Sequence, residues 1–129
     1  MMTPLDLSSL RPGLLLEVKD QLLGQWSFVA ASTEPRGEFS FTTSSGPKFR
    51  ISRDGLNSAI LVRRYARGNE AQKCFTIQAR IAGAGGAIGM LQFRAPSVAE
   101  RNRWLCAFDA NGWTLLDFSG GDARTLIYG

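Results

Sequence analysis

The side chains best suited to bind a ligand are basic and fall in two neighbouring stretches of the sequence. They are Lys48, Arg50 and Arg53 in the first stretch and Arg63, Arg64 and Arg67 in the second. Alternate residues of a strand point to the same face, so Lys48 and Arg50 would lie side by side. If the two stretches face each other, their charged hydrogen-bond donors form a shallow site for an anion. The alternative is a solvated basic edge that discourages pairing with other strands.

The residue types that most catalytic and metal sites need are missing or unsuitably placed. The sequence contains no histidine, which excludes Ser–His and Cys–His nucleophiles and histidine metal ligands. A group of carboxylates in the tail, Asp109, Asp117 and Asp122, has neighbours typical of a helix end and of turns. The glycine-rich run Gly83–Gly89 leads into a strand, unlike the loops before helices that bind nucleotide phosphates. We therefore expect no catalytic residues, no metal site and no cofactor.

Size, charge and cysteine content narrow the class of protein further. The 129 residues correspond to one domain, and the net charge of +4 is spread along the chain, which argues against nucleic-acid binding. No apolar run approaches the roughly 18 residues of a membrane helix, and no secretory signal opens the sequence. Cys74 and Cys106 have apolar neighbours and are expected as buried thiols, with a disulfide between them as the alternative. These features predict a cytoplasmic protein, with peripheral attachment to a membrane or the cytoskeleton as a variant.

Short apolar stretches divided by turn residues predict seven β-strands. The stretches are residues 13–18, 25–31, 38–43, a segment around Phe49 and Ile51, 58–65, 73–81 and 88–94. Glycine, proline, serine and asparagine separate them. The connections are too short for helical crossovers, so we expect mostly antiparallel pairing.

One helix is predicted after these strands, with clear signals at both ends. Ser97 is a natural N-cap, and Glu100 three residues later completes a capping box. The pair Asn111-Gly112 ends the helical pattern. The large apolar residues at helical spacing, which would form part of the core, are Trp104, Leu105 and Phe108.

Two further apolar stretches, 114–118 and 124–129, follow the helix and are predicted to form a hairpin. We expect a lead-in segment of residues 1–12, a domain of residues 13–110 and a C-terminal extension of residues 111–129. Large apolar side chains in the extension need cover, either from the domain or from a partner. The resulting candidates for a protein interaction, or for a contact between copies of this chain, are Trp113, Leu115, Leu116 and Phe118.

The closing stretch of this pattern resembles that of pleckstrin-homology (PH) domains. Residues 91–108, LQFRAPSVAERNRWLCAF, contain a strand with aromatics, a helix that starts at a serine, and an acidic residue four before a tryptophan. KCFTIQAR is similar to the family's sixth strand, Gly13-Leu14-Leu15 to its first, and Trp26 to an aromatic of its second, so the resemblance spans about residues 13–109. It implies a mainly β fold: a seven-stranded antiparallel PH-like barrel of two near-orthogonal sheets. One amphipathic helix caps the barrel, and its Trp104 closes an open corner.

The same resemblance bears on the ligand. PH domains that bind inositol phosphates place a lysine late in the first strand and a basic-x-arginine pair at the start of the second. Lys19 matches the lysine, whereas Gln25-Trp26-Ser27 stands where the pair is expected. One lysine cannot supply the several charged donors that phosphates need. We therefore expect a non-catalytic module for protein interaction or scaffolding. The alternatives are phosphoinositide or anionic-membrane binding through the basic residues above, and a small β-barrel carrier of an apolar ligand.

Overall fold

A computed structural model of the chain describes residues 16–19, 24–33, 39–43, 48–52, 58–63, 67–82 and 88–128. The expected lead-in, residues 1–12, lies outside them. Within these ranges the strands are β1 (Leu16–Lys19), β2 (Trp26–Thr33), β3 (Phe39–Thr43), β4 (Lys48–Ser52), β5 (Ala59–Val62), β6 (Cys74–Ala82), β7 (Ile88–Arg94) and β8 (Thr114–Asp117). The helices are α1 (Asn69–Gln72), α2 (Val98–Ala110) and α3 (Thr125–Tyr128). None of these helices has both the length and the apolar character that crossing a bilayer requires.

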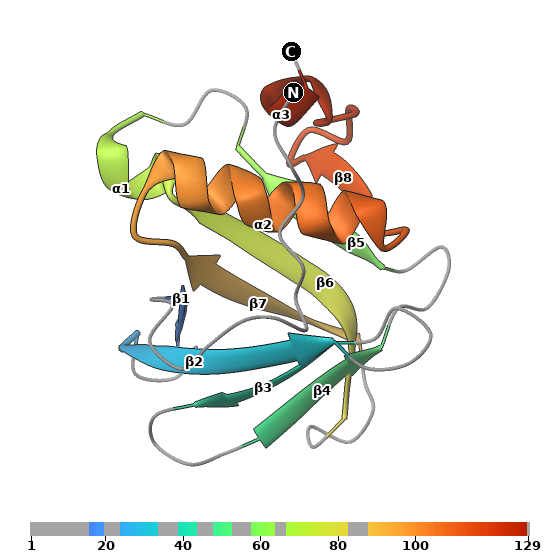
Figure 1. The fold of residues 1–129 in the computed structure, drawn as a ribbon. Coiled ribbons are helices and arrows are strands. Elements are labelled where there is room, and N and C mark those ends of the chain that lie inside the picture. The colour runs from blue at the N-terminus through green and yellow to red at the C-terminus, as the bar shows by residue number, and fades with distance from the viewer. Residues whose placement is uncertain are drawn as a thin grey trace.

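The seven strands predicted from the sequence are confirmed, and six of the described strands close into a ring (Figure 1). β1 to β4 form an antiparallel meander, and β6 pairs with β7. Two narrow seams complete the ring: two residues of β1 pair with β7, and three residues of β4 pair with β6. β4 uses residues 80–82 of β6, while β5 uses residues 76–78 of the same edge. β4 and β5 therefore follow one another along β6.

The C-terminal residues form only the start of the expected hairpin: Leu116 and Asp122 form an antiparallel bridge, and the Ala123 amide donates to the Leu115 carbonyl at 3.1 Å. β8 pairs in parallel with β5, with Leu115 opposite Ile60, and the second half of the expected hairpin is the helix α3. Short apolar runs suit a strand or a helix equally well, so their local pattern could not distinguish the two. The sheet thus has eight described strands and one parallel pair, in place of seven antiparallel strands. α2 connects β7 to β8, which run in the same direction, and so provides the helical crossover that parallel strands need.

α2 begins and ends where the sequence predicts. The Ser97 hydroxyl accepts a hydrogen bond from the Glu100 amide at 3.1 Å, and Gly112 takes a φ of 87° just after the helix. Trp104 is only 3% exposed, and Leu105 and Phe108 are fully buried, which confirms all three as core residues. The helix is buried on more than one face, because β8 and α3 lie on the side opposite the ring (Figure 1). Residues 104–108 of α2 are all buried, while Ala99, Arg103 and Ala110 are exposed, so the helix still presents one strip to solvent, as expected of an amphipathic helix.

Aromatic side chains connect the tail to the far side of the ring. The ring of Phe108 lies 5.6 Å from Trp113 and 5.9 Å from Phe75, measured between centroids. Phe75 stacks on Phe93 at 5.5 Å, and Phe93 meets the edge of Phe41 at 5.4 Å. This row of contacts crosses α2, β6, β7 and β3, so the interior that the structure describes is filled by the protein's own side chains.

Residues beyond the expected domain boundary at Ala110 belong to the same core. Trp113 and Leu115 are each 2% exposed and pack with the ring and α2. This corrects the prediction that they present an interaction surface, because β8 buries them by adding to β5. Leu116 is half-buried, and Phe118 is 44% exposed. Of the expected contact residues, Phe118 is therefore the most accessible.

Candidate ligand-binding pocket

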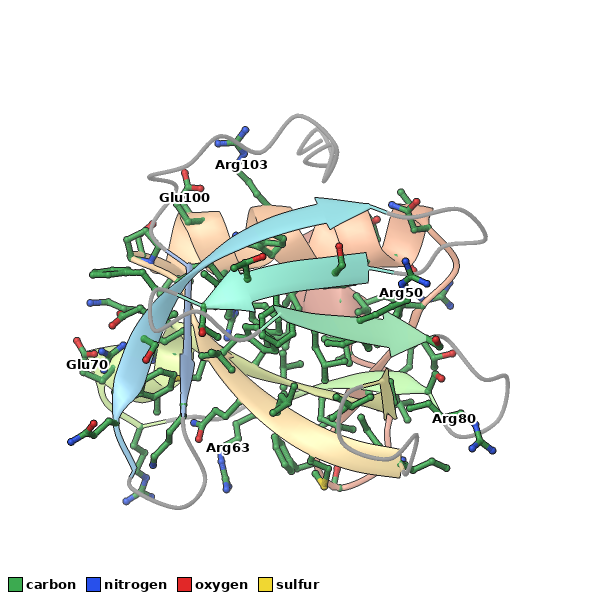
Figure 2. All side chains as sticks on the ribbon, turned by 90° about the horizontal axis from the view of Figure 1, so that it is seen from below. Arg50, Arg63, Glu70, Arg80, Glu100 and Arg103 are labelled. Carbon is green, nitrogen blue, oxygen red and sulfur yellow. The ribbon has the colours of Figure 1, made fainter. Side chains whose placement is uncertain are left out.

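The basic residues expected to form one anion site lie at two distant places. Arg50 on β4 is opposite Ala82 of β6, whereas Arg63 follows β5, whose Leu61 is opposite Thr76. The two places are thus about eight residues apart along β6, or roughly 25 Å at the rise of a strand. Figure 2 shows Arg50 and Arg63 well apart. The prediction of a shared site is wrong for this pair because β4 and β5 meet β6 one after the other.

Of the other basic residues predicted in the two stretches, only Arg67 has a described side chain. Arg67 is exposed and lies just before α1. Lys48 belongs to β4, where its backbone is opposite Thr42, but its side chain lies outside the described part of the structure. Arg53 and Arg64 lie outside the described residues altogether.

A cavity of about 410 Å³ opens on the outer face of the sheet, over neighbouring parts of β6 and β7. Its floor includes Cys74 and Thr76 from β6 and Met90 and Gln92 from β7. Thr76 is directly opposite Gln92 in the antiparallel pair. These residues alternate along their strands with buried side chains that point into the core. The pleat of the two strands therefore provides a floor of mixed polar and apolar character.

Two cations flank this floor from opposite sides. Lys19 ends β1, which adjoins β7, while Arg63 follows β5, which adjoins β6. Because the strand order is β1-β7-β6-β5, the floor lies between them. Lys19 and Arg63 are the charged residues among the described side chains that line the cavity. The described lining is thus positively charged.

Each of these cations lies against an aromatic ring. The Cζ atom of Arg63 is 4.8 Å from the ring centroid of Phe118, and the Nζ atom of Lys19 is 5.9 Å from that of Trp26. The Phe118 amide donates to the Val62 carbonyl at 3.2 Å, which fixes the backbone beneath the ring. A cation–π contact orients a charge without neutralising it. Neither cation takes part in the ion pairs found among the described residues.

A neighbouring cation, Arg94, is neutralised by contrast. It donates to both carboxylate oxygens of Glu17, at 3.1 and 3.2 Å, and to Glu70 at 3.4 Å, while Lys73 lies 3.0 Å from Glu70. The hydrogen bond to Glu17 raises the pKa of Arg94, and the hydrogen bond from Lys73 lowers the pKa of Glu70. Two cations and two carboxylates cancel, so this cluster adds little net charge to the adjoining pocket.

The two cysteines are free, which contradicts the disulfide alternative. Cys74, on the pocket floor, is partly exposed and donates to the Glu70 carbonyl at 3.3 Å, whereas Cys106 is fully buried. Burial raises the pKa of both thiols, so they are protonated at neutral pH and are poor nucleophiles. The described residues also contain no group of three or more side chains suited to a metal ion.

The sequence predicts both Lys19 and Arg63 as candidate binding residues, but it does not predict that they line the same pocket. The PH resemblance points to Lys19 and the second basic stretch to Arg63, while Met90 and Gln92 are not predicted as site residues. A usable signal is the alternation in residues 73–81, which places Cys74, Thr76 and Gln78 on one face of the strand. That pattern identifies the outer face, but not which strands adjoin it.

Comparison with known proteins adds no assignment. No model of a protein family matches the chain, and no curated protein or solved structure matches it either.

Proposed function

We propose that the chain is a non-catalytic, PH-like binding module that recognises a protein partner through the outer face of β6 and β7. The observation that carries this proposal is the pocket lined by Met90 and Phe118 together with Lys19 and Arg63. The PH-like assignment is supported by the strand order of β1 to β4 and by the helix with buried Trp104. The resemblance in residues 91–108 supports the same assignment.

Exposed apolar side chains on the same outer face support a protein partner. Met90 is 42% exposed and Phe118 44%, and both line the pocket. Phe28 of β2 and Ile88 of β7 are also large, exposed and on outward-pointing positions. Met90 and Phe118 share the pocket, and Ile88 lies two residues from Met90 on the same face of β7, whereas Phe28 is opposite Glu17 on the far side of the Arg94 cluster. Exposed apolar side chains that lie together mark interaction surfaces, and interfaces are enriched in aromatics, methionine and arginine.

The alternative functions have less support. A phosphoinositide headgroup needs several donors that converge, but Arg50 and Arg63 are far apart and Arg94 is occupied by two carboxylates. A carrier needs an empty interior, whereas the described interior is occupied by aromatic rings such as Phe75 and Phe93. A protein ligand on the outer face requires neither feature.

Selection of peptides from a random phage-displayed library tests this function and does not require the partner to be identified. Selected peptides are expected to shift the backbone amide resonances of residues 74–76 and 90–92, and to bind Met90→Asp much less than the wild type. A matched control is Thr114→Asp, also exposed on a strand but outside the lining of the pocket. Peptides that perturb other surfaces alone would contradict the proposal. Sedimentation with vesicles that depends on anionic lipid, without peptide binding, would favour the membrane alternative.

A further inference from the structure

We infer that the pocket between Lys19 and Arg63 receives an acidic side chain of the partner together with a neighbouring apolar side chain. This inference rests on the proposed function and adds the chemistry of the segment that binds. The described charged residues of the pocket lining are both cations, and the apolar residues beside them are exposed.

Charge complementarity selects the acidic part of the ligand. A carboxylate placed over the floor would accept charge-assisted hydrogen bonds from the ammonium or the guanidinium group. The contacts with Trp26 and Phe118 already orient the two cations, so less side-chain freedom is lost on binding. A basic partner segment would instead be repelled.

The apolar part of the ligand follows from the residues beside the cations. Met90 offers a flexible thioether chain that adapts to different side chains, and Phe118 offers a partly exposed ring. Thr76 and Gln92 supply polar atoms between them that suit a peptide backbone. The cavity of about 410 Å³ lies near the small end of ligand pockets, about 300–1,000 Å³, and suits a few side chains of a short segment.

The positions of the cations favour a carboxylate over a phosphate. A phosphate carries more charge and is normally held by several donors that surround it. Here one cation stands on each side of the floor, and the nearby Arg94 already donates to both oxygens of Glu17. Single carboxylates on an extended peptide match two separated cations better than one compact phosphate does.

The test titrates isotope-labelled protein with two capped hexapeptides. In the first, serine alternates with aspartate, phenylalanine and aspartate in turn, so that acidic and apolar side chains share one face of the extended peptide; in the second, asparagine replaces each aspartate. The acidic peptide is expected to shift the amide resonances of Thr76 and Gln92 and to bind about tenfold more tightly or better. It should also slow alkylation of Cys74, which reports on the floor because the other cysteine, Cys106, is fully buried. Equal binding of the two peptides would overturn the inference.

Arg63→Gln is expected to weaken the acidic peptide about tenfold and to leave the weak binding of the asparagine peptide unchanged. Arg103→Gln is the matched control, because it removes the same charge from an exposed position on α2. Figure 2 shows Arg103 and Arg63 on opposite sides of the molecule. Equal weakening by both variants would overturn the inference, since it would reduce the effect to net charge.

Two further arms separate this inference from other ligands and from the proposed function. The same amide resonances are followed with inorganic phosphate and with vesicles that contain anionic lipid. If either shifts these resonances more strongly than the acidic peptide does, the inference is overturned. Phage-selected peptides that occupy the pocket but carry no acidic residue would also overturn it, while leaving the proposed function intact. If no selected peptide reaches the pocket, the proposed function itself fails.

Discussion

The guanidinium of Arg94 lies over the ring of Trp26, with its Cζ atom 4.3 Å from the ring centroid. Arg94 belongs to β7 and Trp26 to β2, and Glu17 of the intervening β1 accepts hydrogen bonds from the same guanidinium. β1 and β7 share only two backbone-paired positions. Side chains therefore reinforce one of the narrow seams that close the ring.

Arg94→Ala is expected to lower the free energy of unfolding by about 1–2 kcal/mol, because it removes a forked, half-buried ion pair and a cation–π contact. Arg94→Lys should recover little of this loss, since an ammonium cannot donate to both oxygens of Glu17 in the same geometry. Urea unfolding measures both variants. Arg103→Ala, which breaks an exposed pair with Glu100, should cost about 0–0.5 kcal/mol. Similar losses for Arg94→Ala and Arg103→Ala would contradict the reinforcing role.

Trp104→Ala is expected to cost about 3–5 kcal/mol, because it leaves a large cavity between α2 and the ring. Thermal unfolding followed by circular dichroism would show this as a much lower midpoint or as loss of a cooperative transition. Phe118→Ala is the comparison, since that ring is largely accessible and its loss should cost about 1 kcal/mol or less. If Trp104→Ala leaves the unfolding midpoint nearly unchanged, the claim that this indole stabilises the core would be wrong.

A chain that ends at Ala110 is expected to lose cooperative unfolding. It lacks Trp113 and Leu115, which are buried against the ring and α2, and their loss approaches the about 5–15 kcal/mol stability of a typical domain. Light scattering should show the full chain as a monomer of 14.1 kDa and the shortened chain as an aggregate. If the shortened chain is instead a folded monomer while the full chain is a dimer, the result would support the contact between copies that the sequence suggests.

Stability at alkaline pH should depend on Tyr128. Its hydroxyl donates to Asp109 at 2.7 Å and joins α3 to α2, and this bond, followed by burial, raises the pKa of Tyr128 to about 12. A raised pKa means that folding favours the neutral hydroxyl. The stabilisation is therefore present below pH 10, the ordinary pKa, and disappears as the pH rises to about 12.

Tyr128→Phe should lower the free energy of unfolding by about 1 kcal/mol at neutral pH. The effect is no larger because the side chain is partly exposed, and solvent weakens the hydrogen bond there. The difference from the wild type should shrink above pH 10. Urea unfolding at several pH values measures it, and an absorbance titration follows the tyrosinate directly. A difference that is constant up to pH 12 would show that the hydrogen bond does not cause it.

Alkylation under native conditions should modify Cys74 and spare Cys106. Cys74 is partly exposed, but burial raises its pKa, so its reaction should be slow at neutral pH and accelerate above pH 9. Cys106 should react only after unfolding, because it lies on α2 within the core and has no exposed surface. Mass spectrometry of the alkylated protein distinguishes the two sites. Simultaneous modification of both thiols would contradict the burial of Cys106 in the core.

The strands and α2 could be predicted from the sequence because their signals are local. Alternation of side chains marks the strands, and the Ser97 cap with Asn111-Gly112 marks the ends of α2. Each signal depends on residues within a few positions of one another. For the same reason the sequence supplies the residue types of the pocket, including Lys19 and Arg63, and the burial of Trp104.

Which strands lie next to one another could not be predicted in this way, because pairing joins residues that are distant in the chain. Nothing within the short run 114–117 specifies its partner, and in the structure its parallel addition to β5 buries Leu115. The pairing of the strands also places Arg63 far from Arg50 and beside Phe118, across the pocket floor from Lys19. The pocket exists because of that packing, since no short stretch of the chain contains both of its cations.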